Sequence, residues 1–217
     1  MSPSASVVIV NYGTPRLTRA AMWSVRSHYP DLEVVVVDNA SPDGSAEMLE
    51  AAARDIGRAT LHRLDHNAHH GPGMDYGIRA VESDWVILLD SDCLICRRGA
   101  VEALLEAAVS EGAYMAGRLH WVDDDGFDGG RTPYVHPHFA LVHRATYLSL
   151  PPFGRHGAPC LHNERAAVDR SLRLVHVPVD QWSLHIGQGT VSRYGYGLPM
   201  QSRLRQLRRT VRRLVGL

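Results

Sequence analysis

The stretch Trp85-Val86-Ile87-Leu88-Leu89-Asp90-Ser91-Asp92 decides the fold, because an apolar run of five residues ends in two carboxylates. Such a run is typical of a strand buried on both faces of a parallel sheet. Open α/β sheets bind ligands at the carboxyl ends of their strands. Asp90 and Asp92 would repel each other unless a cation lay between them, and Mg²⁺ or Mn²⁺ accepts such oxygen ligands. The stretch therefore predicts a metal site at a strand end. The alternative is a polar strand end in which Asp92 caps the next helix.

Strands and helices alternate through the first half of the chain. Strands are expected at 6–10, 32–37, 60–64 and 85–89, with helix-sized segments between them, the last of which is a helix at 74–81. A later strand is expected at 139–142. This alternation predicts right-handed crossovers and the α/β class, with a mostly parallel central sheet flanked by helices. No G-x-G-x-x-G follows the first strand and the chain has no lysine, which argues against a Rossmann dinucleotide site and a P-loop.

Four motifs match a known family in order and spacing. They are the first strand with its Asn11-Tyr12 end, the run VVVDNASPDGS at 35–45, Asn67 with Gly71 and Gly77, and Asp90-Ser91-Asp92. Together they resemble the GT-A fold glycosyltransferases of family 2, with Asp90-Ser91-Asp92 as the D-x-D motif. The Asn-Tyr and Asp-Asn-Ala-Ser variants look most like the rhamnosyltransferase-like branch.

The resemblance implies a single GT-A domain over residues 1–200, with 6–100 as the nucleotide-sugar-binding half and 101–200 as the acceptor half. It implies metal-dependent, inverting transfer of a sugar from a nucleotide diphosphate to an acceptor hydroxyl on a glycan, a lipid-linked molecule or a natural product. In similar enzymes, the loop after strand one and the carboxylate ending strand two bind the nucleobase. Tyr12 offers a ring face to the base, and Asp38 can accept the ring N–H of uracil or thymine, which favours UDP or dTDP donors.

The donor residues implied by the resemblance are Val10, Asn11, Tyr12, Asp38, Asn67, Gly71, Asp75, Asp90 and Ser91. Two of them have plainer alternatives: Tyr12 as half-buried packing and Asp38 as a cap for the loop to Ser41. The segment 66–75 departs from the family pattern, since it carries a run of histidines and Asp75 in place of an asparagine. Its histidines either donate to a diphosphate or lie in a solvated loop.

The resemblance also places metal ligands and a general base. Asp92 and His185 would hold Mn²⁺ or Mg²⁺, with Asp90 assisting. Imidazole is a common ligand of first-row metals and suits Mn²⁺ better than Ca²⁺. The family's catalytic helix normally opens with a Glu-Asp pair, but Pro159-Cys160 occupies that place.

The nearest residues that can take a proton from a hydroxyl are Glu164 and His162. The missing pair leaves a sugar-nucleotide-binding protein with little or no transfer as an alternative. A nucleotidyltransferase is a weaker one, because its glycine-rich loop with a lysine is absent.

Charge is balanced overall but uneven along the chain. Residues 202–217 hold six arginines and no acid, and their apolar residues follow helical spacing. This pattern predicts a basic amphipathic helix at 201–217 that contacts a membrane surface, forms a homodimer or covers the sheet. The sequence has no apolar run of 18 residues, and its three cysteines fit a reducing compartment. These features favour the cytoplasm, including the inner membrane face. Nucleic-acid binding is not expected, since the basic segment lacks interleaved aromatics.

Overall fold

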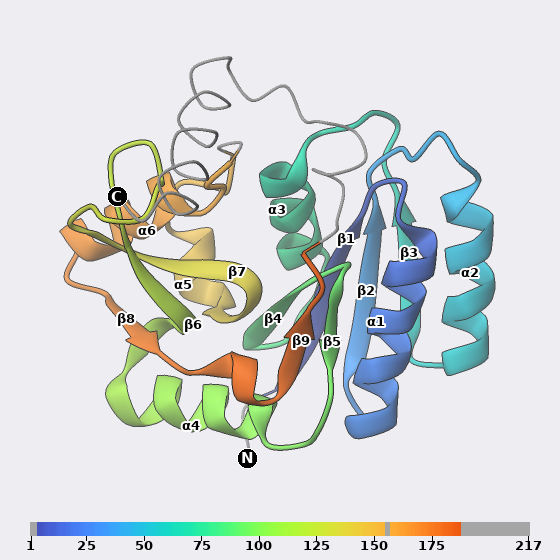
Figure 1. The fold of residues 1–217 in the computed structure, drawn as a ribbon, viewed down its shortest axis with the longest axis horizontal. Helices are drawn as coiled ribbons and strands as arrows, with labels where there is room; N and C mark the ends of the chain where they lie inside the picture. The colour runs from blue at the N-terminus through green and yellow to red at the C-terminus, as the bar shows by residue number, and fades with distance from the viewer. Residues whose placement is uncertain (1–3, 155–156, 188–217) are drawn as a thin grey trace, which may run out of the picture. The chain divides into compact units, whose positions relative to one another are not determined.

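A computed structural model describes residues 4–154 and 157–187 of the chain, whose compact unit ends at Gly187. Its centre is a seven-stranded sheet in the order β3-β2-β1-β4-β7-β6-β8 (Figure 1). The strands are β1 (Ala5–Asn11), β2 (Glu33–Asp38), β3 (Ala59–Arg63), β4 (Trp85–Asp90), β6 (Ala113–Val122), β7 (Thr132–His143) and β8 (Arg173–His176). Strands β3-β2-β1-β4 are parallel, and β7 runs antiparallel to both β4 and β6. The mostly parallel α/β fold expected from the sequence is therefore confirmed.

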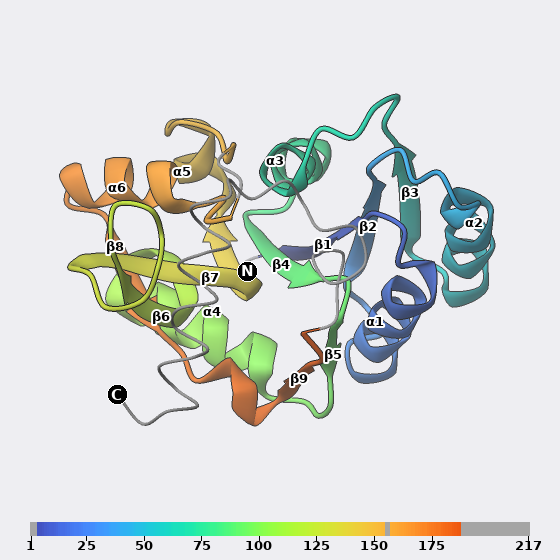
Figure 2. The same cartoon turned by 45° about the horizontal axis from the view of Figure 1, so that its top comes forward.

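Helices cover both faces of the sheet, because successive strand residues point to opposite sides. In β1, Val7 and Ile9 pack in one core with residues of α1, α2 and α4, while Val8 and Val10 pack in the other with residues of α3 and α6. Figure 2 shows α3, α5 and α6 on one side of the sheet and α1 and α4 on the other. The helices are α1 (Pro15–His28), α2 (Ser45–Ile56), α3 (His70–Ala80), α4 (Ala100–Glu111), α5 (Arg144–Leu148), α6 (Leu161–Asp169) and the 3₁₀ turn η1 (Val179–Gln181).

A second, two-stranded sheet was not expected from the sequence. The chain after Asp92 enters β5 (Cys93–Ile95), which pairs antiparallel with β9 (Ser183–His185). The alternative in which Asp92 caps a helix is therefore wrong. The small sheet matters for function, because it carries a segment from the end of the described chain back to the carboxyl end of β4.

Three other expectations have plain outcomes. The helix expected from Met74 begins four residues earlier, at His70. No helix of residues 4–154 and 157–187 is long and apolar enough to cross a membrane. The expected basic helix at 201–217 lies outside the described residues.

Helix α3 approaches β1 closely at Gly77. A Cβ atom at this position would lie 2.3 Å from Cγ1 of Val8, so a side chain must push α3 away from the sheet. We expect Gly77→Ala to lower the free energy of unfolding by about 1–3 kcal/mol, because overpacking outweighs the gain in helix propensity. Denaturant unfolding measures the change. Gly154→Ala is the matched control, since a Cβ there meets no atom within 4 Å. An equal effect of both substitutions would contradict the close-packing argument.

Candidate active site

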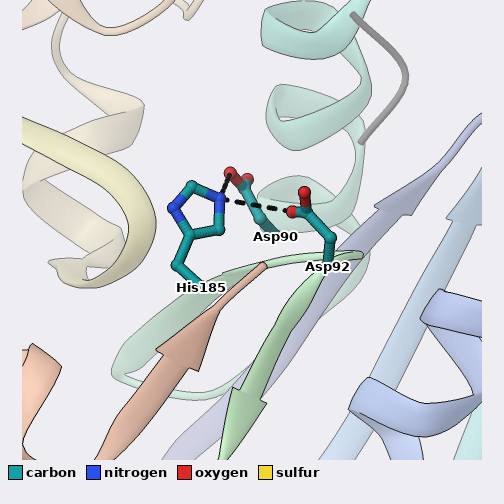
Figure 3. A group of neighbouring side chains, drawn as sticks. All are labelled: Asp90, Asp92 and His185. Atoms are coloured by element: carbon teal, nitrogen blue, oxygen red, sulfur yellow. Dashed lines mark ion pairs between the residues drawn. The ribbon is translucent and has the colours of Figure 1, made fainter. Parts of the chain in front are cut away.

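Asp90, Asp92 and His185 form one cluster at the carboxyl end of β4. The β5–β9 pairing sets Cys93 opposite His185, and the amide of Ile186 donates to the carbonyl of Asp92 at 3.0 Å. His185 Nε2 then lies 3.3 Å from Asp92 Oδ1 and 3.7 Å from Asp90 Oδ2. Figure 3 shows the imidazole facing both carboxylates.

The cluster has the electrostatics of a cation site. The hydrogen bond with Asp92 raises the pKa of His185, with the charge of Asp90 adding to it. Burial opposes ionisation of Asp90, but the hydrogen bond from His70 and nearby histidines outweigh it, so the pKa of Asp90 is well below its usual range. One ligand atom from each of Asp90, Asp92 and His185 lies within 4.8 Å of the others. Two carboxylates and an imidazole at these separations fit a divalent cation such as Mn²⁺.

A buried polar network lies beside this cluster, at the carboxyl ends of β1 and β2. Asp38 Oδ1 accepts from Asn11 Nδ2 at 2.7 Å and from Ser41 Oγ at 2.6 Å, and its Oδ2 accepts from the amide of Ser41 at 3.2 Å. Asn11 also accepts at its Oδ1 from Thr18 Oγ1 at 2.7 Å. Asp38 thus caps the loop to Ser41, which was the plainer of the two interpretations. Its contact with a nucleobase stays a prediction.

The remaining residues predicted at β1 and β4 lie close by. Val10 is buried in the core under α3, Tyr12 is partly exposed, and Ser91 is nearly buried. The hydroxyl groups of Ser91 and Thr14 lie 3.2 Å apart, which links the end of β4 to the start of α1.

The histidine-rich segment leads into α3 and reaches the carboxylates. Asn39 holds it, accepting from the amide of Ala68 at 2.8 Å and donating to the carbonyl of His69 at 3.0 Å. His70 Nε2 lies 3.3 Å from Asp90 Oδ1. One histidine of the run therefore joins the site.

The other residues predicted in this segment make local contacts. Asn67 accepts from the amide of His69 at 2.9 Å, and Gly71 passes so close to Gly154 that a Cβ would lie 2.9 Å from its nitrogen. Asp75 accepts from Tyr147 Oη at 2.7 Å and pairs with Arg79 at 3.0 Å. Asp75 is thus engaged by two side chains, and its role toward a donor stays a prediction.

His69 has a backbone conformation that side chains disfavour. Its φ is 71° and its ψ 173°, a region adopted almost only by glycine, at a cost of about 1–3 kcal/mol. We expect His69→Gly to raise the free energy of unfolding by about 1 kcal/mol, after the greater entropy of glycine in the unfolded chain is subtracted. Thermal unfolding measures the gain. His69→Ala keeps the disfavoured conformation, so a gain of the same size there would contradict the explanation.

The two candidates for a general base differ in accessibility. Glu164 is fully buried on α6, its Oε2 accepts from the amide of Val135 at 2.8 Å, and burial raises its pKa well above the usual range. Its Oε1 has no hydrogen-bond partner among the described residues. His162 is exposed. No hydrogen bond or ion pair among the described residues joins Glu164 or His162 to the Asp90 cluster, and their catalytic role stays a prediction.

Two residues that sequence reasoning missed lie beside the cluster. His138 of β7 stacks on His185 with ring centroids 4.9 Å apart, and His136 lies next to it. Their one sequence signal is His-Pro-His at 136–138, inside a segment expected to become a strand only from Phe139 onward.

The strands β1, β2 and β4, which carry the sequence motifs, end at the same edge of the sheet as the cluster of Asp90, Asp92 and His185. A sequence model described as Glycosyl transferase family 2 matches residues 6–172. The chain belongs to this family. In this family 2 chain, Asp90-Ser91-Asp92 follows β4, Asp38 ends β2, and Pro159-Cys160 precedes α6.

Solved structures share the fold of this chain. The mannosyltransferase PcManGT of Pyrobaculum calidifontis, solved in complex with GDP-Man and Mn²⁺, is similar at a TM-score of 0.68 and 19% identity, over 82% of this chain and 55% of that one. TarS 1–349 of S. aureus, solved with UDP-GlcNAc, is similar at 0.60 and 15%, over 80% and 56%. At such identities the likeness shows the GT-A fold.

One curated relative shares more sequence over a shorter stretch. The succinoglycan biosynthesis protein ExoO of Rhizobium meliloti (strain 1021) is 30% identical over 115 residues, which are 52% of this chain and 32% of that protein. The match therefore spans about a third of the relative's length.

Proposed function

We propose that this family 2 chain is a metal-dependent, inverting glycosyltransferase that moves a sugar from a nucleotide diphosphate to an acceptor hydroxyl. The observation that carries the proposal is the convergence of Asp90, Asp92 and His185 at the sheet edge where β1 and β2 also end. Support comes from solved neighbours with the same fold that hold GDP-Man with Mn²⁺ or UDP-GlcNAc.

The cluster fits Mn²⁺ or Mg²⁺, held by Asp92 and His185 with Asp90 assisting. A cation there would neutralise the charge that develops on the leaving nucleoside diphosphate. The chain's own residues would orient the donor: Tyr12 beside the base, and Asp38 accepting the ring N–H of uracil or thymine. UDP and dTDP are therefore the proposed donor nucleotides.

The reaction exchanges one bond at the anomeric carbon. The acceptor oxygen forms a bond to that carbon, the bond from carbon to the diphosphate oxygen breaks, and the diphosphate leaves with the electron pair. In-line attack inverts the configuration. The hydroxyl proton passes to a general base, for which Glu164 and His162 are the candidates predicted from the sequence.

One alternative has its own support. A protein that binds a sugar nucleotide but transfers poorly would explain why Pro159-Cys160 replaces the family's acidic pair and why Glu164 is buried. Tight donor binding without transfer or donor hydrolysis would establish this alternative.

Calorimetric titration with UDP, dTDP and GDP, in Mn²⁺, in Mg²⁺ and in EDTA, tests the proposal. We expect one nucleotide to bind with metal and to bind much more weakly in EDTA. Equal affinity in EDTA would contradict metal dependence, and no binding under any condition would contradict the donor site. Transfer with retained anomeric configuration, read by NMR of the product, would contradict inversion.

The imidazole ligand should set the preference between metals. We expect His185→Ala to weaken Mn²⁺-dependent nucleotide binding more than Mg²⁺-dependent binding, because nitrogen ligands favour Mn²⁺ over the oxygen-seeking Mg²⁺. The ratio of the two dissociation constants, before and after the change, measures this. His62→Ala on β3 is the control, and a ratio unchanged by His185→Ala would remove His185 from the metal site.

A further inference from the structure

Strand β7 carries a bulge beside the candidate metal site of Asp90, Asp92 and His185. Its pairing with β6 passes from Gly117↔Ala140 to Leu119↔Val135, so two steps on β6 correspond to five on β7. Bulges of this kind bend a strand and redirect its side chains, often next to active sites. The extra residues include His136, Pro137 and His138, and proline has no N–H to donate to a ladder.

The bulge also faces β4. Pairing between β4 and β7 ends at Leu89↔Phe139, so the next residue of β7, His138, comes opposite Asp90. In Figure 3 the pale yellow ribbon of β7 curves past the His185 ring. The bulge therefore borders the carboxylates directly.

Four imidazole rings follow one another from the candidate metal site toward β6. They belong to His185, His138, His136 and His120, and we call them the imidazole row. Ring centroids of neighbours are 4.9 Å apart for His185 and His138, 4.9 Å for His138 and His136, and 6.1 Å for His136 and His120. The side chain of His138 is 3% exposed, whereas those of His185 and His120 are 32% and 27% exposed. The row is thus open to solvent at both ends.

Hydrogen bonds within the bulge leave one nitrogen for a ligand. His136 Nδ1 lies 2.9 Å from His138 Nδ1 and also accepts from the amide of His138 at 3.3 Å. Nε2 of His136 has no such partner among the described residues, and its ring is partly exposed. His138 Nε2 is instead buried and directed to Asp180 Oδ1, 3.7 Å away.

The row suits an uncharged ligand. Carboxylates flank it along its length, with Asp180 3.7 Å from His138 and Asp128 3.4 Å from His120, in addition to the pair beside His185. Arg118 lies there too, but it is paired with Asp180 at 2.7 Å. An anionic acceptor would therefore meet like charges, whereas imidazole nitrogens form hydrogen bonds with hydroxyl groups. Sugar hydroxyls match this chemistry, whereas a phosphate or carboxylate acceptor does not.

We propose that the β7 bulge and the imidazole row form the acceptor subsite, and that Nε2 of His136 hydrogen-bonds the attacking hydroxyl of an uncharged, hydroxyl-rich acceptor. The proposal rests on the proposed function, because it assigns the acceptor side of the same reaction. It assigns the contact with the acceptor to His136, which borders the carboxylates, and not to Glu164, which is buried on α6.

The test compares His136→Phe and His136→Asn with wild type, using UDP-GlcNAc, dTDP-rhamnose and GDP-mannose with Mn²⁺. Calorimetry measures donor affinity, and nucleotide release measures both donor hydrolysis and transfer. The acceptor probes are p-nitrophenyl β-glucoside and p-nitrophenyl β-glucuronide, which differ by one carboxylate. His62→Phe, on β3, is the matched control, and thermal unfolding confirms that each variant is folded.

We expect His136→Phe to keep the donor dissociation constant within about twofold and to slow hydrolysis and transfer at least about tenfold, equivalent to 1.4 kcal/mol. His136→Asn, which keeps a polar group, should retain more activity than His136→Phe. Wild type should use the glucoside better than the glucuronide.

Three results would overturn the inference: unchanged rates in both His136 variants, a loss of donor affinity in both, or a preference for the glucuronide. Failure of the proposed function is a different result, since wild type would then show neither metal-dependent donor binding nor nucleotide release. Activity in wild type with the same activity in His136→Phe would reject the acceptor subsite alone.

Discussion

Asp92→Asn should abolish Mn²⁺-dependent nucleotide binding while the protein stays folded. The side chain of Asp92 is nearly buried, and its Oδ1 lies 3.3 Å from His185 Nε2. Asparagine keeps the shape of the side chain but removes its charge. Loss of a group that merely supports a metal ligand costs about 10–100-fold in affinity, so loss of a ligand should cost at least about 100-fold. Calorimetric titration of the favoured nucleotide in Mn²⁺ measures the change.

The fold should tolerate this substitution. The link between β9 and the end of β4 uses the carbonyl of Asp92, which accepts from the amide of Ile186 at 3.0 Å, and asparagine retains that carbonyl. We therefore expect thermal unfolding without metal to shift little. Asp55→Asn, at an exposed position of α2, is the matched control for charge removal. Wild-type affinity in Asp92→Asn would mean that the cluster does not hold the metal.

Long buried strands were predictable from sequence because each one is a continuous run of apolar residues. Residues 34–37 are four consecutive valines, and residues 85–89 of β4 are an unbroken apolar run. Such segments become strands wherever they lie in the sheet. Helix α3 was placed too late, since Gly71-Pro72-Gly73 disfavours a helix interior. The structure uses this segment as the first turn, where proline is tolerated and where glycine allows close approach to Gly154 and Val10.

In the candidate site, too, the residues on long strands were predictable and those on short or irregular segments were not. Asp38, Asp90 and Asp92 follow long strands, so the sequence places them at one sheet edge. His185 was assigned through the family resemblance, and no periodicity predicts the three-residue strands β5 and β9 that bring it there. His136 and His138 were missed because a bulge has no repeating pattern, and both lie before the strand expected at 139–142.

The burial of Glu164 could not be read from the sequence either. Beside the polar residues His162 and Asn163 it looks like a solvent-facing helix residue, yet Asn163 and Glu164 are both fully buried against β6 and β7. Packing between elements far apart in the chain decides this, and local sequence does not record it.

The second large effect should appear in stability, at Asn11. This side chain is fully buried and joins β1, β2 and α1, because it donates to Asp38 and accepts from Thr18. Asn11→Ala leaves the buried Asp38 carboxylate without one of its donors. We expect the free energy of unfolding to fall by about 2–4 kcal/mol. Asn67→Ala, which removes a partly exposed local hydrogen bond, should cost under about 1 kcal/mol.

Asn11→Asp makes the same argument testable by pH. The new carboxyl group would lie about where Asn11 Nδ2 is now, 2.7 Å from Asp38 Oδ1, so one carboxyl of the pair would have a raised pKa in the folded state. A raised folded-state pKa gives stability that is fully present below the unfolded value of about 3.9 and is lost as pH rises. The free energy of unfolding of Asn11→Asp should therefore fall further below that of wild type as pH rises above 4, by up to about 1.4 kcal/mol per pH unit, until the raised pKa is passed. Urea unfolding of both proteins at pH 5 and pH 8 measures it. A deficit independent of pH would show that Asn11 does not donate to a charged Asp38.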